Sequence, residues 1–452
     1  MSTLTSPFHT PASAEYAAST AAYNLIANLR PSAALTATTT AEVIEAVRSA
    51  ARQGLQLSVF TTGHAARGMA RLEGALLMRM AFDTPVTIDV ERRVATIPAG
   101  SVWGDVVSLA AEHGLAVAHG SSATVGAIGY LLRGGLSFYG RLRGVASNGL
   151  VSVTIVTADG SLVKADAQNE PELFWAVRGG GGGFGVVVEV EIELFPIWNI
   201  ITGFVAWDAR DADRIAPLWR DWTETAANEA TTSLRLMNLP PLPEIPEPLK
   251  NGQILVLDGA ITMQTREDLA YGADLAESLL EPLREAVTPV MDTWRLGTAR
   301  DLPATHMDPP DPMPFLTDHF LLERFDDAAI GAWLEAGTDT VLAAAELRQL
   351  GGAFAAGPAD GGAFNAVRGQ FAAFNAGVTA GPATPEIVVA HQRRIREALA
   401  GYDTGFTAPT FVEERDSRHR AFPADVEARV EAIRARFDPT GIFDRDVTRA
   451  TI

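Results

Sequence analysis

The sequence contains no cysteine among its 452 residues. This absence excludes disulfide bridges, cysteine nucleophiles, iron–sulfur clusters and thiolate zinc sites. No apolar run reaches the length of about 18 residues that a membrane-spanning helix needs. Residues 1–22 also lack the basic start and apolar stretch of a secretory signal. From these absences we expect a cytoplasmic protein.

Positive charge is scarce relative to negative charge. Lys and Arg number 36 against 55 Asp and Glu, which gives a formal net charge of −19. Nucleic acids and anionic membranes require clustered positive charge, so neither is an expected partner. Histidine is scarce as well, and the eight present form no HExxH or His-x-His pattern. No metal site is therefore predicted.

The first half of the chain reads as alternating helices and strands. Thr39 and Glu42 form a capping box that predicts a helix ending at Gly54. Apolar patterning then predicts the remaining elements. These are strands at 55–60, 76–80, 86–90, 94–98 and 186–195, a helix at 101–114, a hairpin at 151–157 and 162–165, and a short helix around 173–175.

The second half has a different composition, which favours a second domain. Residues 238–250 hold too many prolines for a helix or a central strand, and predict an extended surface segment. A second loop, 308–314, holds four prolines. Further helices are predicted at 326–342, 385–400 and 424–437, and a strand at 346–350 that ends at a Gly-Gly pair.

Two glycine clusters are the most informative local features. The run 179–183 consists of five glycines, and the second cluster spans 120–126 with Gly129, Gly134 and Gly135. No Gly-Lys-Ser/Thr follows either cluster, and the first lies after a helix and before a strand, the reverse of a Rossmann loop. A flexible linker is the alternative for the five-glycine run. Because backbone N–H groups in such loops can close on phosphate, the clusters together favour an extended ligand with a pyrophosphate.

His64 is the histidine with the most suggestive position, in a loop after a predicted strand and next to Gly63. An isolated histidine is more often an ordinary polar residue than a ligand, and that alternative stays open on the residues alone.

The ordered set of motifs resembles the berberine-bridge-enzyme-like FAD-linked oxidoreductases, within the wider vanillyl-alcohol-oxidase and p-cresol-methylhydroxylase flavoprotein family. The matching segments are 63–64, 97–100, 103–104, 120–126, 129–130, 134–135, 156–160, 173–185, 350–353 and 437–443. They extend over most of the chain in the family's order. The resemblance identifies a family but no substrate.

The resemblance implies an α+β fold with a PCMH-type FAD-binding domain. A substrate domain would contain a large antiparallel sheet covered by helices. The expected boundaries are 1–200 for the FAD domain and 201–403 for the substrate domain. Residues 404–452 would form a C-terminal segment that returns to the FAD domain.

The resemblance also implies which residues hold FAD. His64 matches the position that bonds covalently to the flavin, and Ser122 stands where some members carry a second attachment through cysteine, so only one bond is expected. The expected FAD-binding residues are Thr61, Thr62, Gly63, His64, Ala65, Gly120, Ser121, Ser122, Thr124, Val125, Gly126, Gly129, Tyr130, Gly134, Gly135, Gly183, Gly185, Val186 and Thr410.

One departure from the family concerns the catalytic base. Where the family often has Tyr-x-Asn-Phe, this chain has 408–411, Ala-Pro-Thr-Phe, so the usual tyrosine is missing. We assign Tyr130 to support of the reduced flavin and Glu346 with Arg348 to substrate contact, the alternative being an ion pair on the outer face of the sheet. Val125 is assigned to oxygen access, the alternative being simple packing of its loop.

The expected activity is that of an FAD-dependent oxidase. Such an enzyme moves hydride from a small organic alcohol, amine or phenolic substrate to flavin N5, and O₂ is then reduced to H₂O₂. A flavin dehydrogenase with another electron acceptor, and a flavin-binding protein without redox turnover, are the alternatives.

Overall fold

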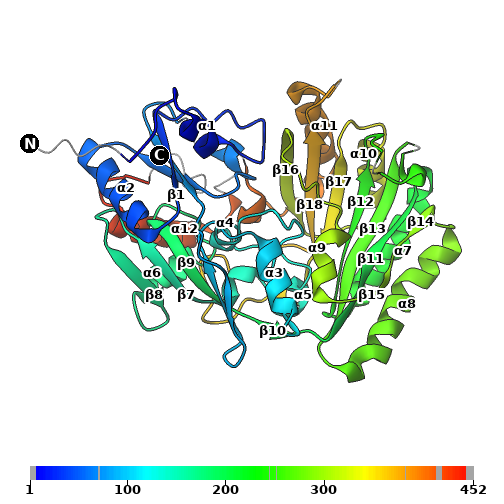
Figure 1. Cartoon of the computed structure of the whole chain (residues 1–452). Helices are drawn as coiled ribbons and strands as arrows, with labels where there is room; N and C mark the ends of the chain where they lie inside the picture. The colour runs from blue at the N-terminus through cyan, green and yellow to red at the C-terminus, as the bar shows by residue number, and fades with distance from the viewer. Residues whose placement is uncertain are drawn as a thin grey trace, which may run out of the picture.

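The computed structural model describes residues 7–69, 72–243, 245–250, 252–381, 383–413 and 420–443. Figure 1 shows two groups of elements that lie side by side, and among the described residues no sheet is shared between them. The first group contains β1–β10 with α1–α6 and α12, and the second contains β11–β18 with α7–α11. Within the described residues, no helix is long and apolar enough to cross a membrane. The cytoplasmic location stays a prediction.

The first group contains an antiparallel five-stranded sheet, a parallel three-stranded sheet and a short two-stranded pair. The five-stranded sheet has the order β4 (Thr87–Asp89), β5 (Val94–Pro98), β9 (Val186–Glu193), β7 (Leu150–Val156) and β8 (Leu162–Asp166). The three-stranded sheet has the order β1 (Ala33–Ala37), β3 (Leu76–Met80) and β2 (Leu57–Phe60), and the pair is β10 (Phe195–Pro196) with β6 (Leu115–Ala116).

In the part of the chain that the structure describes, the first group contains four helices at or near predicted positions, and three short ones, α1, α4 and α5, that the sequence analysis did not predict. The capping box of Thr39 and Glu42 is formed, and Gly54 ends that helix with a left-handed φ of 63°. The helices are α1 (Ala14–Thr20), α2 (Thr40–Gln53), α3 (Trp103–Ala111), α4 (Ala127–Leu132), α5 (Gly140–Arg143), α6 (Pro171–Val177) and α12 (Ala424–Phe437).

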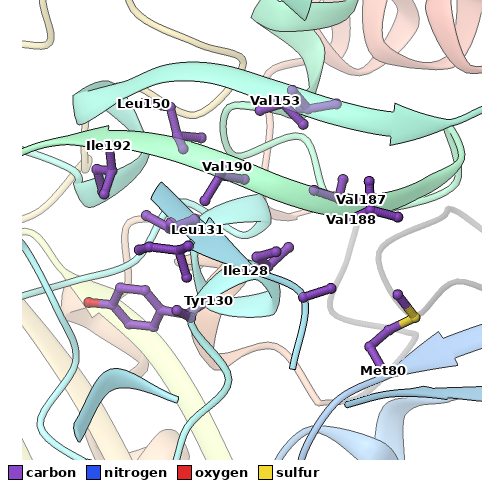
Figure 2. Packing of buried hydrophobic residues seen from close by; sticks show 14 of the residues in the cluster. Met80, Ile128, Tyr130, Leu131, Leu150, Val153, Val187, Val188, Val190 and Ile192 are labelled. Carbon is purple, nitrogen blue, oxygen red and sulfur yellow. The ribbon is translucent and has the colours of Figure 1, made fainter. Parts of the chain in front are cut away.

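A continuous apolar core fixes α4 in the first group. Ile128, Tyr130 and Leu131 of α4 pack with Val153 of β7 and Val190 of β9 (Figure 2). Burying side chains of this size contributes about 1.5–3 kcal/mol each. The loop that precedes α4, with its glycines, is therefore attached to a rigid body.

The second group is a large antiparallel sheet, as the resemblance predicts. Its order is β14 (Met291–Asp292), β11 (Asn199–Asp208), β13 (Ile254–Met263), β12 (Ala230–Met237), β17 (Ala344–Gln349), β18 (Phe371–Val378) and β16 (Phe315–Leu322), and β15 (Arg295–Gly297) pairs with β11. The α+β fold class is confirmed.

The two faces of this sheet have different chemistry because successive strand residues point to opposite sides. Leu234, Leu257 and Leu347 belong to an apolar core with the covering helices. Those helices are α7 (Ala212–Thr225), α8 (Leu269–Ala286), α10 (Asp327–Gly337) and α11 (Pro385–Ala398). The opposite face carries charged side chains, and α9 (Leu302–Thr305) precedes the loop that crosses it.

Several predicted boundaries were wrong. The helix predicted over 326–342 ends at Gly337, because Thr338 is extended and Asp339 adopts a left-handed φ of 52°. The strand predicted over 186–195 ends at Glu193, and the chain then forms β10. The helix predicted over 101–114 is shorter in the structure, where α3 extends from Trp103 to Ala111. It begins later than predicted because the backbone is extended at the N-cap residue Val102.

The domain boundaries at 200 and 403 stay predictions. In the structure α12 packs on α6, and Arg434 donates hydrogen bonds to the carbonyls of Gly180 and Gly182. Residues 444–452 of the expected C-terminal segment lie outside the described residues.

Candidate functional site

A cavity of about 1030 Å³ lies between the glycine loops of the first group and the charged face of the eight-stranded sheet. Pockets for small ligands usually measure about 300–1,000 Å³, so this one has room for a large ligand. Most of the residues predicted from the sequence line it: Thr61, Thr62, Gly63, His64, Ala65, Gly120, Ser121, Ser122, Val125, Gly126, Gly129, Tyr130, Gly183, Gly185, Val186, Glu346, Arg348 and Thr410.

Three predicted residues do not line the cavity. Thr124 lies behind His64 and forms a hydrogen bond with it. Gly134 and Gly135 have left-handed φ values of 87° and 80°, and a side chain at Gly135 would clash with the ring of Tyr130. These two glycines therefore permit tight packing against Phe364 and Tyr130, and their role in FAD binding stays a prediction.

The His64 loop follows β2 and is fixed by an N-terminal segment that runs beside it. Tyr23 N–H donates to the carbonyl of Thr62 at 2.8 Å, and Asn24 N–H donates to that of Gly63 at 3.3 Å. Gly63 has a φ of 82°, and a Cβ there would lie 2.7 Å from the Cβ of Ala22. Glycine is required at this position on both counts.

His64 is held from two sides. Its ring stacks on that of Tyr23 with centroids 3.7 Å apart and planes 19° from parallel. Its Nε2 lies 3.2 Å from the hydroxyl of Thr124, which is itself 3.0 Å from the hydroxyl of Ser122. Burial lowers the pKa of His64 to about 4, so the imidazole is neutral at physiological pH. Within the described part of the chain, Nδ1 has no hydrogen-bond partner.

The glycine loops have the shape of a cradle. A Cβ on Gly129 would meet no atom within 4 Å, and Gly129 lines the cavity, so any side chain there would enter the empty space. A Cβ on Gly126 would lie 3.0 Å from Thr61.

The five-glycine run is ordered by its contacts, which argues against a flexible linker. Gly181 N–H donates to the carbonyl of Leu132 at 2.7 Å. Gly183 has a φ of 91°, and a Cβ there would lie 2.7 Å from Nε of Arg434. The run therefore depends on glycine at defined positions.

Glu346 and Arg348 lie on the inner face of the sheet, so the outer-face alternative is wrong. Arg348 Nε donates to Glu346 Oε1 at 2.6 Å, and its guanidinium lies over the rings of Phe374 and Phe411. The side chain of Glu346 is 1% exposed and that of Arg348 is 16% exposed. Burial alone would raise the pKa of Glu346, but Arg348 and His306 outweigh it and lower that pKa.

Three charged residues of this face were missed by the sequence analysis: Arg235, Asp258 and His306. Arg235 pairs with Asp258, whose Oδ2 lies 3.0 Å from Nδ1 of His306. Strand pairing sets Arg235 directly opposite Glu346 and Asp258 directly opposite Ser233, and the loop after α9 adds His306. Arg235 and Asp258 stand out in the sequence as charged residues within mostly apolar strands. Which strands pair with one another could not be derived from the sequence, so their proximity could not be predicted.

Tyr130 is buried and its hydroxyl donates to the carbonyl of Leu136 at 2.7 Å. Burial raises the pKa of Tyr130, so the phenol stays protonated. The one hydroxyl proton of Tyr130 is therefore already donated to a carbonyl of the protein. The role assigned to Tyr130 in flavin support stays a prediction, and would require the hydroxyl to change its acceptor.

Comparison with known proteins identifies the ligand class of the glycine loops. Residues 31–166 match the family model described as "FAD binding domain". The chain contains an FAD-binding domain. The matched segment includes the His64 loop and the 120–126 cluster. It contains every expected FAD-binding residue except Gly183, Gly185, Val186 and Thr410.

The curated relatives are similar over part of this chain. The chain is 34% identical over 179 residues to (R)-6-hydroxynicotine oxidase of Paenarthrobacter nicotinovorans, covering 39% of each chain. It is 30% identical over 209 residues to glucooligosaccharide oxidase of Sarocladium strictum, covering 45% of this chain and 42% of that one. The matched segments thus span about two fifths of the length of these relatives.

Solved structures extend the similarity to the whole fold. The 6-hydroxy-D-nicotine oxidase of Arthrobacter nicotinovorans superimposes with a TM-score of 0.84 at 23% identity, over 99% of this chain and 98% of that chain. The BBE-like 1 protein of Physcomitrella patens gives 0.81 at 20% identity, over 96% and 95%. The resemblance to the berberine-bridge-enzyme-like proteins and the PCMH-type FAD-binding fold are both confirmed.

Proposed function

We propose that this chain is an FAD-dependent oxidase of small organic alcohols, amines or phenols. The observation that carries the proposal is that one cavity joins the glycine loops of the FAD-binding domain to a charged face of the antiparallel sheet. Such a cavity would allow a flavin and a substrate to lie in contact. When bound, FAD supplies the two-electron chemistry by accepting a hydride and passing the electrons on.

The residues of the chain fit FAD in a defined way. The side-chain-free surface at Gly126 and Gly129 leaves backbone exposed to the cavity, as a pyrophosphate requires. We infer that His64 forms a single covalent bond to the flavin, because it lines the cavity as a neutral imidazole with Nδ1 available. Thr410 and Val186 also line the cavity and would contact the cofactor.

Oxygen is the proposed electron acceptor. Val125 lines the cavity, and the larger leucine at this position would fill about one more methylene of space. The relatives named above are oxidases by name, which supports O₂ as acceptor over another partner.

The test begins with anaerobic mixing of the purified holoprotein with a panel of aromatic and aliphatic alcohols, amines and phenols. Bleaching of the flavin absorbance by a panel member supports redox turnover, and no bleaching by any member contradicts it. Oxygen is then admitted, and H₂O₂ is measured with a peroxidase-coupled assay. One H₂O₂ for each substrate oxidised supports an oxidase. Flavin that stays reduced in air, but is reoxidised by an artificial acceptor, contradicts it and indicates a dehydrogenase.

A further inference from the structure

His306 is a buried histidine on the cavity wall, and no sequence motif predicted a role for it. It directly follows α9, where the loop 306–314 crosses the charged face of the eight-stranded sheet. The next residue, Met307, has a left-handed φ of 56° although it is not glycine. Strain of this kind persists only where surrounding contacts impose it. The contacts of His306 therefore hold the loop in place.

Charged groups from three strands surround the His306 ring. From β13, Asp258 Oδ2 lies 3.0 Å from Nδ1. From β17, Glu346 Oε2 lies 3.4 Å from Nε2, and Arg348 Nη2 lies 3.0 Å from the same atom. From β12, Arg235 pairs with Asp258 and also donates to the His306 carbonyl at 2.9 Å.

These distances define the tautomer of the neutral ring. A guanidinium nitrogen can only donate, so its approach to Nε2 requires a lone pair on that atom. The single ring proton then resides on Nδ1, which lies 3.0 Å from the Asp258 carboxylate but outside hydrogen-bond geometry. In this state the one lone pair of Nε2 accepts from Arg348, which is also paired with Glu346. Nε2 lies on a residue that lines the cavity and accepts a proton from a cavity ligand when Arg348 turns away from it, and Glu346 then pairs with the protonated ring.

The surrounding charges favour the protonated ring. Burial and the neighbouring Arg235 lower the pKa of His306, but the carboxylates of Asp258 and Glu346 outweigh them and raise it to about 9. Arg348 also lowers the pKa of His306. Arg348 is paired with the Glu346 carboxylate, whose negative charge acts on His306 in the opposite direction. The edge of the Phe138 ring covers another side, 5.8 Å between centroids, and brings no charge.

We propose that His306 is the proton acceptor of this cavity, positioned by Asp258 and assisted by Glu346. The proposal rests on the proposed oxidase function. As the substrate C–H bond gives its hydride to the oxidised flavin, the O–H or N–H bond gives its proton to Nε2, and a C=O or C=N double bond forms. The proton later leaves with the two electrons and the hydride hydrogen to convert O₂ into H₂O₂, which balances the cycle.

The proton site itself is tested without any substrate. Holoprotein labelled with ¹⁵N-histidine is titrated by long-range ¹H–¹⁵N NMR, and His306→Gln assigns the resonances. We expect the His306 ring to lose a proton near pH 9 and to become the Nδ1–H tautomer above it. A His306 ring that keeps one state from about pH 6.5 to about pH 10, or that is neutral with its proton on Nε2, overturns the proposal.

The catalytic role is tested by the pH profile of anaerobic flavin reduction, with benzyl alcohol and benzylamine as probes. The wild-type rate should rise with pH up to about 9, as His306 loses its resident proton. In His306→Gln this rise should disappear and the rate at high pH should fall about 100-fold or more. Glu346→Gln removes one carboxylate, so the rise should move to lower pH. His113→Gln, at an exposed histidine after α3, is the matched control and should keep the wild-type profile.

The outcomes separate this proposal from the proposed function. A wild-type pH profile in His306→Gln overturns the catalytic role and leaves the oxidase intact. No flavin reduction by either probe or by the wider panel contradicts the oxidase and, with it, the catalytic role. The NMR titration then still decides whether the proton site exists.

Discussion

The ring of Tyr23 stacks on the imidazole of His64, with 3.7 Å between their centroids. Tyr23 also joins the two groups of elements, because its hydroxyl donates to the carbonyl of Pro309 in the loop that crosses the sheet. Burial and the nearby Asp308 raise the pKa of Tyr23 to about 12, so it remains a neutral donor. The residue proposed to bind flavin is thus fixed by contacts that reach the opposite wall of the cavity.

Thr124 and Tyr23 should control the rate at which flavin becomes attached to His64. Thr124→Val removes the only hydrogen-bond partner of Nε2 seen in the described residues, and Tyr23→Leu removes the stack. Each should slow attachment about tenfold, which corresponds to about 1.4 kcal/mol. The measurement is flavin retained by acid-precipitated protein after apoprotein is mixed with FAD. Thr124→Ser keeps the hydroxyl and should attach flavin at the wild-type rate. Equal rates in all four proteins would contradict this account.

Val125→Leu should slow reoxidation of the flavin by O₂ and leave anaerobic reduction nearly unchanged. The larger side chain would fill space in the cavity wall, at the place where we propose that O₂ approaches. Stopped-flow absorbance resolves the two half-reactions. Equal slowing of both would indicate general damage to the site and remove the support for an oxygen-access role.

Tyr130→Phe should lower the free energy of unfolding by about 1–3 kcal/mol, because the buried Leu136 carbonyl loses its donor. Tyr139→Phe is a matched control. The Tyr139 hydroxyl is buried and has no partner within the described residues, so its removal should cost little. Urea denaturation measures both. Flavin reduction slowed at least about tenfold in Tyr130→Phe would show the electrostatic role predicted from the sequence, and a wild-type rate would exclude it.

Asp258→Asn should lower the free energy of unfolding by about 3–5 kcal/mol, because Arg235 would be left as an unpaired buried charge. The control is Glu45→Gln, which breaks an exposed ion pair with Arg52. It should change the free energy of unfolding by less than about 1 kcal/mol. The two values come from the same denaturation series. A small effect of Asp258→Asn would show that the charged cluster of the sheet is not coupled to folding.

The sequence predicted the first group better than the second for physical reasons. Signals for β3, β5 and α2 are local, since they come from alternation, capping and helical spacing. The FAD-binding loops carry glycines that motif order could connect. The cluster of Arg235, Asp258 and His306 depends on strand pairing across the eight-stranded sheet, which no local pattern specifies. Glu346 was found because its strand ends at a recognisable Gly-Gly pair.

The intact mass of the denatured wild-type chain tests the central claim most directly, namely that this cavity holds FAD on His64. The account predicts a mass increased by one FAD minus two hydrogen atoms, and an unmodified mass for His64→Ala. A wild-type chain of unmodified mass, with FAD in the supernatant, would contradict the covalent bond and leave the cavity assignment intact. A wild-type chain of unmodified mass that also binds no FAD on reconstitution would contradict the account as a whole.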